Sequence, residues 1–244
     1  CILMRYVISG LNGELKIFQN LIKRIQAQDK DAIFILLGNQ FKINFSWEML
    51  NWLMDNITPN GRFQAVLNKE GHIILDWYHN KFLAWKNGEI LEYPSVTKEV
   101  SSILYYASSL NEKELKNIID YYMSLPVCKY LQQYSNSIQH DYYVVESWID
   151  STLIKSLQSG LHSRNDLKCM KEYCLFYPGD GSDYTDTGRY YVVRANYEGK
   201  CYTRRNTIAL STETVCCYCV DTEKFIEEEV CFSVGACSLV RRTI

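Results

Sequence analysis

Three asparagines stand where apolar segments of the chain end. Asn12 follows RYVISGL, Asn39 follows FILLG, and Asn68 follows RFQAVL. An amide side chain offers one carbonyl oxygen and two N–H donors, which suit either a bound ligand or the backbone of a turn. Asparagine is a common turn residue, so a purely structural role is the alternative to ligand contact at all three positions.

No sequence pattern indicates an activated nucleophile. The chain has neither a GxSxG segment nor a phosphate-binding glycine loop followed by lysine. No serine or cysteine stands at a motif spacing from a histidine, which is what nucleophilic catalysis needs. Any chemistry must therefore come from another arrangement.

The ten cysteines include a cluster at Cys216, Cys217 and Cys219. Alternation on a strand sends neighbouring side chains to opposite faces, and no second CxxC pair is present to complete a zinc site. A chain of this length does not need disulfides to fold. We predict reduced, partly buried thiols in a cytoplasmic protein, with a zinc cluster as the alternative.

Length and charge exclude several classes of function. With 244 residues, the chain is expected to form one α/β domain covering residues 1–244. Its 26 basic and 28 acidic residues give a net charge of −2, which predicts neither a nucleic-acid nor a membrane partner. No apolar run reaches the roughly 18 residues of a membrane-spanning helix. Residues 1–3 precede Met4, are expected to lie before the natural start, and are assigned no function.

The first elements predict where a ligand site would lie. Residues 5–10 are typical of a buried strand, residues 15–26 have helical apolar spacing, and residues 31–39 contain a second buried strand. Such a βαβ unit is normally right-handed and parallel, so the strand ends at Gly10 and Gly38 share one rim. Ligand sites of open α/β sheets lie at that rim.

The rest of the chain alternates between helical and extended patterns. Helices are expected at 47–56, 72–85 and 111–124, the last opened by Asn111 and Glu114 in a near capping box. A further strand is expected at 62–68. After Pro126 short segments rich in valine, tyrosine and threonine predict strands, namely 141–150, 189–196, 206–212 and 215–221. Glycines and aspartates at 177–189 predict a mobile loop.

The order of these segments resembles the calcineurin-like metallophosphoesterases, on the bacterial serine/threonine-phosphatase branch. RYVISGLNG followed by a helix and FILLGN is similar to their D-x-H-G opening and GD-x-x-DRG segment. VLNKEGH stands at the GNHE position, DYYVVESWID at the strand ending in VHAG, and RYYVVRAN at VVFGH. The resemblance extends over residues 5–225 and implies a four-layer αββα sandwich with two packed mixed sheets.

The metal ligands of that family are almost all replaced here. The family uses two divalent metals such as manganese, iron or zinc to generate a hydroxide nucleophile and to clamp the phosphoryl oxygens. Of six ligand positions, only Asn68 keeps its family identity. The replaced positions carry neutral side chains or a new carboxylate, and Lys69 replaces the catalytic histidine. The degenerate site positions are Gly10, Asn12, Asn39, Asn68, Lys69, Glu146 and Asn196.

Several remaining side chains have alternative roles. Lys69 could pair with Glu146 in the emptied metal pocket, or it could be a solvated surface lysine. Lys171 stands where the family carries an arginine, and with Arg194 it could bind a phosphate group; both could equally be exposed charges. Trp148 could fill the old site where the family has glycine.

The resemblance therefore implies a pseudo-phosphatase with no metal cofactor, acting by binding a protein or a phosphorylated ligand. One alternative is an active metallophosphoesterase with a remodelled site built from Asn12, Asn39, Asn68, His72 and Glu146, acting on a phosphoprotein or a dinucleoside polyphosphate. A second alternative is a structural or assembly subunit whose exposed aromatic side chains form an interface.

Overall fold

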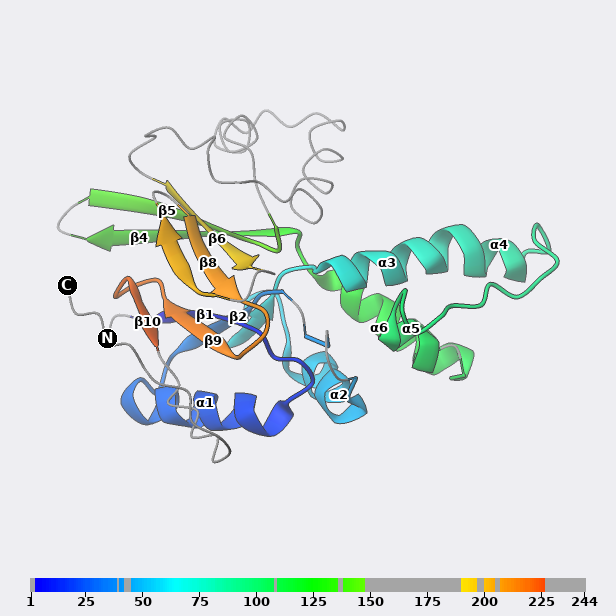
Figure 1. Ribbon diagram of the computed structural model, residues 1–244, viewed down its shortest axis with the longest axis horizontal. Helices are drawn as coiled ribbons and strands as arrows, with labels where there is room; N and C mark the ends of the chain where they lie inside the picture. Colours follow the sequence, from blue (N-terminus) through cyan, green and yellow to red (C-terminus); the bar gives the residue numbers. More distant parts are fainter. Residues whose placement is uncertain are drawn as a thin grey trace.

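The computed structural model describes residues 3–38, 40–41, 45–107, 109–135, 138–147, 190–196, 200–204 and 207–226. These residues form a mixed α/β domain with two five-stranded sheets (Figure 1). The helices are α1 Leu15–Gln28, α2 Trp47–Asn56, α3 Lys69–Trp77, the π-helix η1 Tyr78–Phe82, α4 Leu83–Lys86, α5 Ser102–Ala107 and α6 Glu112–Ser124. The strands are β1 Arg5–Ser9, β2 Ile33–Leu36, β3 Phe63–Ala65, β4 Cys128–Ser135, β5 Ile138–Val145, β6 Tyr190–Asn196, β7 Tyr202–Arg204, β8 Thr207–Ser211, β9 Cys216–Cys219 and β10 Lys224–Ile226.

The first sheet, sheet A, has the strand order β10-β9-β1-β2-β3. Strands β1, β2 and β3 are parallel, and Arg5 of β1 is opposite Ile33 of β2. Strand β9 runs antiparallel to β1 on its other side, and β10 runs antiparallel to β9. The parallel βαβ arrangement predicted for the start of the chain is confirmed.

The second sheet, sheet B, has the order β4-β5-β6-β8-β7. Strands β5, β6 and β8 are parallel, while β4 and β7 are antiparallel edge strands. Each sheet therefore has three adjacent parallel strands, at the centre of sheet B and on one side of sheet A, whose carboxyl ends can position a site.

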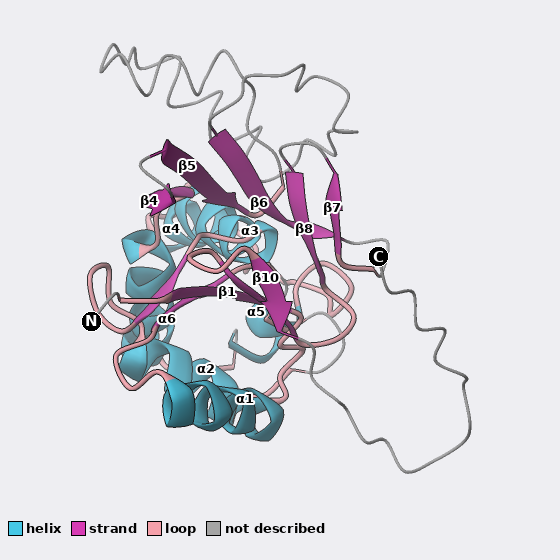
Figure 2. Cartoon of the chain, turned by 90° about the vertical axis from the view of Figure 1, so that its left-hand side faces the viewer, coloured by secondary structure: helices cyan, strands magenta, loops and turns pink. Residues whose placement is uncertain are grey.

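Two apolar layers hold the domain together. The layer between the sheets includes Val7, Ile35, Val144 and Val193, and these four residues are completely buried. On the opposite face of sheet A lies the other core cluster, to which α1, α2, α3 and α6 contribute residues. Figure 2 shows α1 and α2 beneath this face. The described residues thus form helix, sheet and sheet layers, and a fourth, helical layer would have to come from residues outside them.

The helices owe their positions to side-chain caps as well as to apolar faces. Asn111 caps α6, and its capping box with Glu114 is complete, as predicted. Asn68 caps α3, which continues through η1 and α4 as the arm on the right of Figure 1. None of the described helices is long and apolar enough to cross a membrane.

Most of the predicted elements are present. The helix predicted at 72–85 begins three residues earlier because Asn68 caps it, and it includes a π-helical turn. The sequence did not indicate α5, β4, β7 or β10. The loop predicted at 177–189 lies outside the described residues.

Candidate functional site

Strand ends from both sheets meet at Gly38, just after β2. A Cβ atom built on Gly38 would lie 3.0 Å from Ala195 Cβ, 3.1 Å from Ser9 Oγ and 3.5 Å from Glu146 Oε2. Ser9 ends β1, Glu146 directly follows β5, and Ala195 is near the end of β6. The carboxyl ends of the parallel strands therefore converge on one point, which is the predicted place for a site.

Ser9 and Glu146 both project into the layer between the sheets. Ser9 is in phase with Val7, and Glu146 is in phase with Val144, and those two valines belong to the inter-sheet core. Both polar residues are completely buried. Glu146 was expected from the sequence, whereas Ser9 was missed. The only signal for it is a hydroxyl at the end of an otherwise apolar strand.

Gly10 has no room for a side chain. Its φ angle is +74°, and an added Cβ would collide with the backbone carbonyl of Thr214. Both the conformation and the close approach require glycine. An aspartate at this position, as in the metallophosphoesterases, would need the segment 211–214 to move.

Asn12 fastens the loop after β1 to the turn between β8 and β9. Its Nδ2 donates to the carbonyl oxygens of Gly10 at 3.2 Å, Thr212 at 3.1 Å and Glu213 at 3.1 Å. The residue is 5% exposed and has a φ angle of 48°, which asparagine tolerates better than most residues. The Asn12 amide therefore stabilises the backbone of a turn, which is the structural role given above as the alternative to ligand contact.

Asn68 uses both ends of its amide. Its Oδ1 accepts from the backbone N–H of Gly71 at 2.7 Å, which caps α3, and its Nδ2 donates to the Gly38 carbonyl at 3.3 Å. The residue is 1% exposed. It therefore joins the start of α3 to the end of β2, and its oxygen is already hydrogen-bonded.

Replacing Asn68 by alanine is expected to lower the free energy of unfolding by about 2–4 kcal/mol, because it removes a helix cap and leaves a buried carbonyl without its donor. The matched control is Asn111→Ala, which removes an exposed cap only and should cost about 1 kcal/mol. Urea denaturation of both variants measures the difference. Equal losses would show that the bond to Gly38 contributes nothing.

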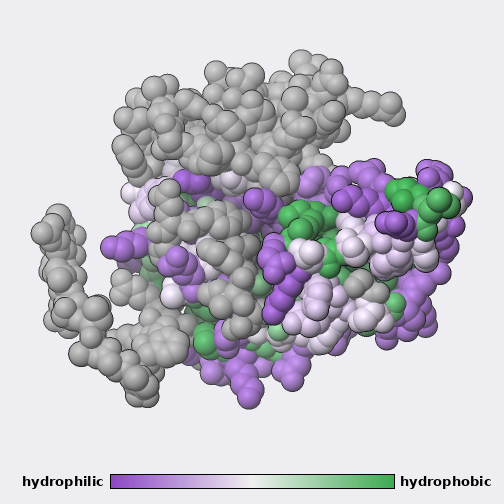
Figure 3. All heavy atoms as spheres, turned by 45° about the vertical axis from the view of Figure 1, so that its right-hand side comes forward, coloured by the Kyte–Doolittle hydropathy of each residue, from purple (hydrophilic) through white to green (hydrophobic). Residues whose placement is uncertain are grey.

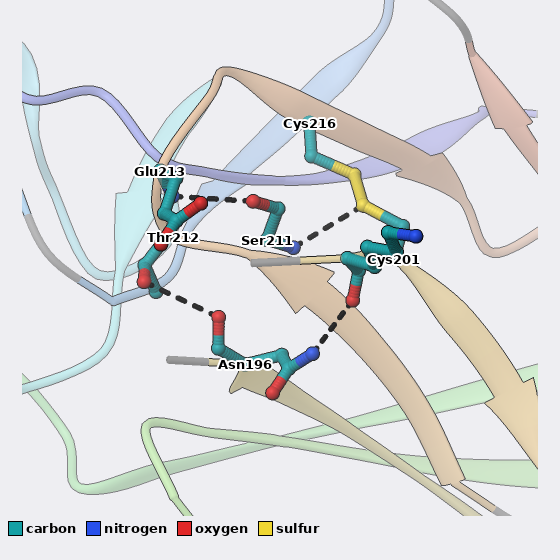
Figure 4. Close-up of a disulfide and its surroundings, with 7 residues drawn as sticks. Asn196, Cys201, Ser211, Thr212, Glu213 and Cys216 are labelled. Atoms are coloured by element: carbon teal, nitrogen blue, oxygen red, sulfur yellow. Dashed lines mark hydrogen bonds between the residues drawn. A yellow bond between two sulfur atoms is a disulfide. The ribbon is translucent and has the colours of Figure 1, made fainter. Parts of the chain in front are cut away.

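Asn196 holds the other side of the same turn, as Figure 4 shows. Its Nδ2 donates to the Lys200 carbonyl at 2.6 Å, and its own carbonyl accepts from the Thr212 hydroxyl at 3.2 Å. The Ser211 hydroxyl in turn accepts from the Glu213 N–H at 3.1 Å. These backbone partners carry no sequence signal, so the network could not be predicted.

Lys69, Glu70 and His72 of α3 lie in different surroundings. Lys69 is exposed and His72 is half-buried. The Glu70 carboxylate accepts from the Ser101 and Ser102 hydroxyls at 3.1 and 3.3 Å and so secures the start of α5. Burial raises the pKa of Glu70, and these hydrogen bonds partly oppose that rise.

The pairing of Lys69 with Glu146 stays a prediction, and the two residues lie in different surroundings. Glu146 is completely buried, whereas Lys69 is a surface residue. The alternative of a surface lysine fits this position.

Arg194 lies apart from the point where the strand ends meet. Its neighbours Val193 and Ala195 face the inter-sheet core, so alternation turns Arg194 to the outer face of sheet B. There its Nη2 donates to the Tyr202 hydroxyl at 2.9 Å. Asn39, Lys171 and Trp148 lie outside the described residues.

One cysteine prediction is wrong. Cys216 forms a disulfide with Cys201, which lies just before β7, so not all thiols of the cluster are reduced. Cys217 and Cys219 point to the helical side of sheet A, and Cys216 points to sheet B, as strand alternation predicts. The sequence could not indicate the pairing, because it depends on how the two sheets face each other.

The donors at the strand ends do not fit a pair of divalent metals. Among the described residues Ser9, Gly10, Asn12, Gly38 and Glu146 at the strand ends, Glu146 supplies the one carboxylate, and Gly10 has no side chain. Ser9 Oγ and Asn12 Oδ1 are buried without a hydrogen-bond partner among the described residues, but both are neutral. One carboxylate and two neutral oxygens cannot balance two dications in a buried place. Within the described ranges, no group of three histidine, cysteine, aspartate or glutamate residues could hold a metal ion.

Comparisons with known proteins assign no activity. No family model matches the sequence, and no curated protein matches it. Among solved structures, the chain is similar to a hypothetical protein from Pyrococcus horikoshii OT3, with 10% sequence identity and a TM-score of 0.48 over 92% of this chain and 86% of that one. The function must therefore be inferred from the site itself.

Proposed function

We propose that this domain is a catalytically silent relative of the metallophosphoesterases, an αββα pseudo-phosphatase that binds a protein or a phosphorylated ligand and hydrolyses neither. The proposal includes a cytoplasmic location. The Cys201–Cys216 disulfide opposes that location unless the bond is reversible, because cytoplasmic thiols are kept reduced.

The observation that carries the proposal is the environment of Gly10. In the family, the corresponding residue is an aspartate that binds a metal. Here the carbonyl of Thr214 occupies the space of the missing side chain, and Asn12 holds that turn with hydrogen bonds to Thr212 and Glu213. A backbone segment thus takes up the place where a ligand would stand.

The amides at the other positions support the same conclusion. Asn68 and Asn196 donate to the carbonyls of Gly38 and Lys200, so these side chains stabilise the backbone. Phosphoester hydrolysis needs a generated nucleophile and a cation to neutralise the phosphoryl charge. A buried carboxyl group at Glu146 supplies no cation.

The test is an assay of phosphoester hydrolysis by the full chain. We expect no turnover of p-nitrophenyl phosphate, phosphopeptides or diadenosine polyphosphates above the blank with manganese, iron or zinc, because metal-free amides cannot supply the roughly 28 kcal/mol that catalysis of such slow reactions can require. Glu146→Gln is the companion variant. Turnover that this variant abolishes would instead support an active enzyme with a remodelled site.

An assembly subunit is the second candidate, favoured by the exposed apolar residues beyond α4. Leu91 is 95% exposed and Ile90 is 40% exposed. Figure 3 shows hydrophobic side chains gathered at that end of the arm. Sedimentation of the wild-type chain and Leu91→Lys would reveal self-association through this surface, which the first candidate does not need.

A further inference from the structure

Among the described residues, the Cys201–Cys216 disulfide is the one side-chain covalent link between the two sheets. Cys216 begins β9 of sheet A, and Cys201 directly precedes β7 of sheet B. The two residues are 15 positions apart in the sequence, and the loop that they close contains β7, β8 and the turn 212–215.

The disulfide is connected to the strand-end site through a short chain of contacts. The backbone N–H of Ser211 donates to Cys201 Sγ at 3.2 Å, and the next two residues, Thr212 and Glu213, supply the carbonyls that Asn12 binds. Figure 4 shows the sulfur atoms and the turn side by side. A change at the disulfide must therefore act on the same turn that fills the space beside Gly10.

We propose that Cys201 and Cys216 form a reversible thiol–disulfide pair that reacts with low-molecular-weight thiols such as glutathione and fixes or releases the turn at 211–214. This inference does not depend on the proposed binding function. It assigns a redox modification site beside the strand ends. A reversible disulfide is also compatible with a compartment in which thiols are kept reduced.

The exposure of the two sulfur-bearing residues decides the direction of attack. Cys201 is exposed, whereas Cys216 is 9% exposed. A small thiolate is therefore expected to attack Cys201 rather than Cys216, and exposed disulfides are the labile ones. The buried partner is the leaving group.

The chemistry balances in both directions. In reduction, a glutathione thiolate bonds to Cys201 Sγ, the Cys201–Cys216 bond breaks, and Cys216 leaves as a thiolate that takes up a proton. A second glutathione thiolate then displaces Cys201, so that glutathione disulfide carries away the oxidising equivalents. In oxidation, the two thiols lose two protons and two electrons to glutathione disulfide, which becomes two glutathione molecules.

The experiment equilibrates the native full chain with a series of reduced-to-oxidised glutathione ratios, blocks free thiols with an alkylating agent, and measures the crosslinked peptide by mass spectrometry. We expect the Cys201–Cys216 crosslink to fall from nearly complete to nearly absent across the series without denaturant. Amide exchange in residues 10–14 and 211–215 should be at least about tenfold faster in the reduced form, because local opening governs exchange.

Two variants sharpen the result. Cys216→Ser should exchange like the reduced protein at every glutathione ratio, whereas Cys219→Ser, on the same strand β9, should keep the wild-type response. The proposal is overturned if the crosslink never forms, if it joins other cysteines, or if it is reduced only after denaturation. Unchanged exchange at residues 10–14 on reduction would also overturn it.

Discussion

Replacing Gly10 by alanine is expected to lower the free energy of unfolding by about 2–5 kcal/mol, which corresponds to roughly 4–20 °C in Tm for a chain of this size. Two effects add. The φ angle of +74° disfavours any side chain, and the new Cβ would meet the Thr214 carbonyl, which is backbone and cannot rotate away.

Gly88→Ala separates these two effects. Gly88 has a similar φ angle of +77°, but nothing lies within 4 Å of its added Cβ. The free energy of unfolding of Gly88→Ala should fall only by the cost of a side chain at a positive φ angle, about 1–2 kcal/mol. Thermal and urea unfolding of both variants give the comparison. If Gly10→Ala costs no more than Gly88→Ala, the turn at 211–214 yields easily and does not exclude a ligand there.

The second large effect is expected for Asn12→Asp, which should lower the free energy of unfolding at neutral pH by about 3–5 kcal/mol. The amide donates to three carbonyl oxygens from a 5% exposed position. A carboxylate there has no hydrogen to donate and would bring a negative charge against those oxygens.

This loss should shrink as the pH falls toward 4. Protonation removes the charge and restores one O–H donor, so the variant is stabilised by acid relative to the wild type. Asn12→Ala is the control, because it loses the hydrogen bonds without adding charge and should cost about 1–3 kcal/mol with little pH dependence. Equal losses in both variants at pH 7 would indicate that solvent reaches Asn12.

The sequence predicted the elements that have strong periodicity of their own. Strands β1 and β2, with α1 between them, follow directly from apolar spacing. Strand β4 was missed because its segment, CKYLQQYS, has few apolar residues and even its buried Gln133 is polar. Helix α5 was missed because it has only six residues. The start of α5 is held by Glu70, more than thirty positions earlier, and such distant support leaves no local pattern.

The position of the candidate site could be predicted from the sequence, but the contacts of its side chains could not. Gly10, Asn68 and Glu146 do lie at the ends of parallel strands. The contacts depend on how the two sheets pack against each other. Asn12, for example, donates to a carbonyl oxygen 200 positions away in the chain. For the same reason the pairing of Cys201 with Cys216 could not be inferred from spacing.

The proposal that the strand-end site binds no pair of catalytic metals is tested most directly by equilibrium dialysis of the full chain against manganese, iron or zinc, followed by elemental analysis. Glu146→Gln, dialysed in parallel, reports on the one buried carboxyl group beside Gly38. We predict less than stoichiometric metal and no difference between the two proteins. One or two equivalents of metal retained at micromolar affinity by the wild type and lost in Glu146→Gln would contradict the account.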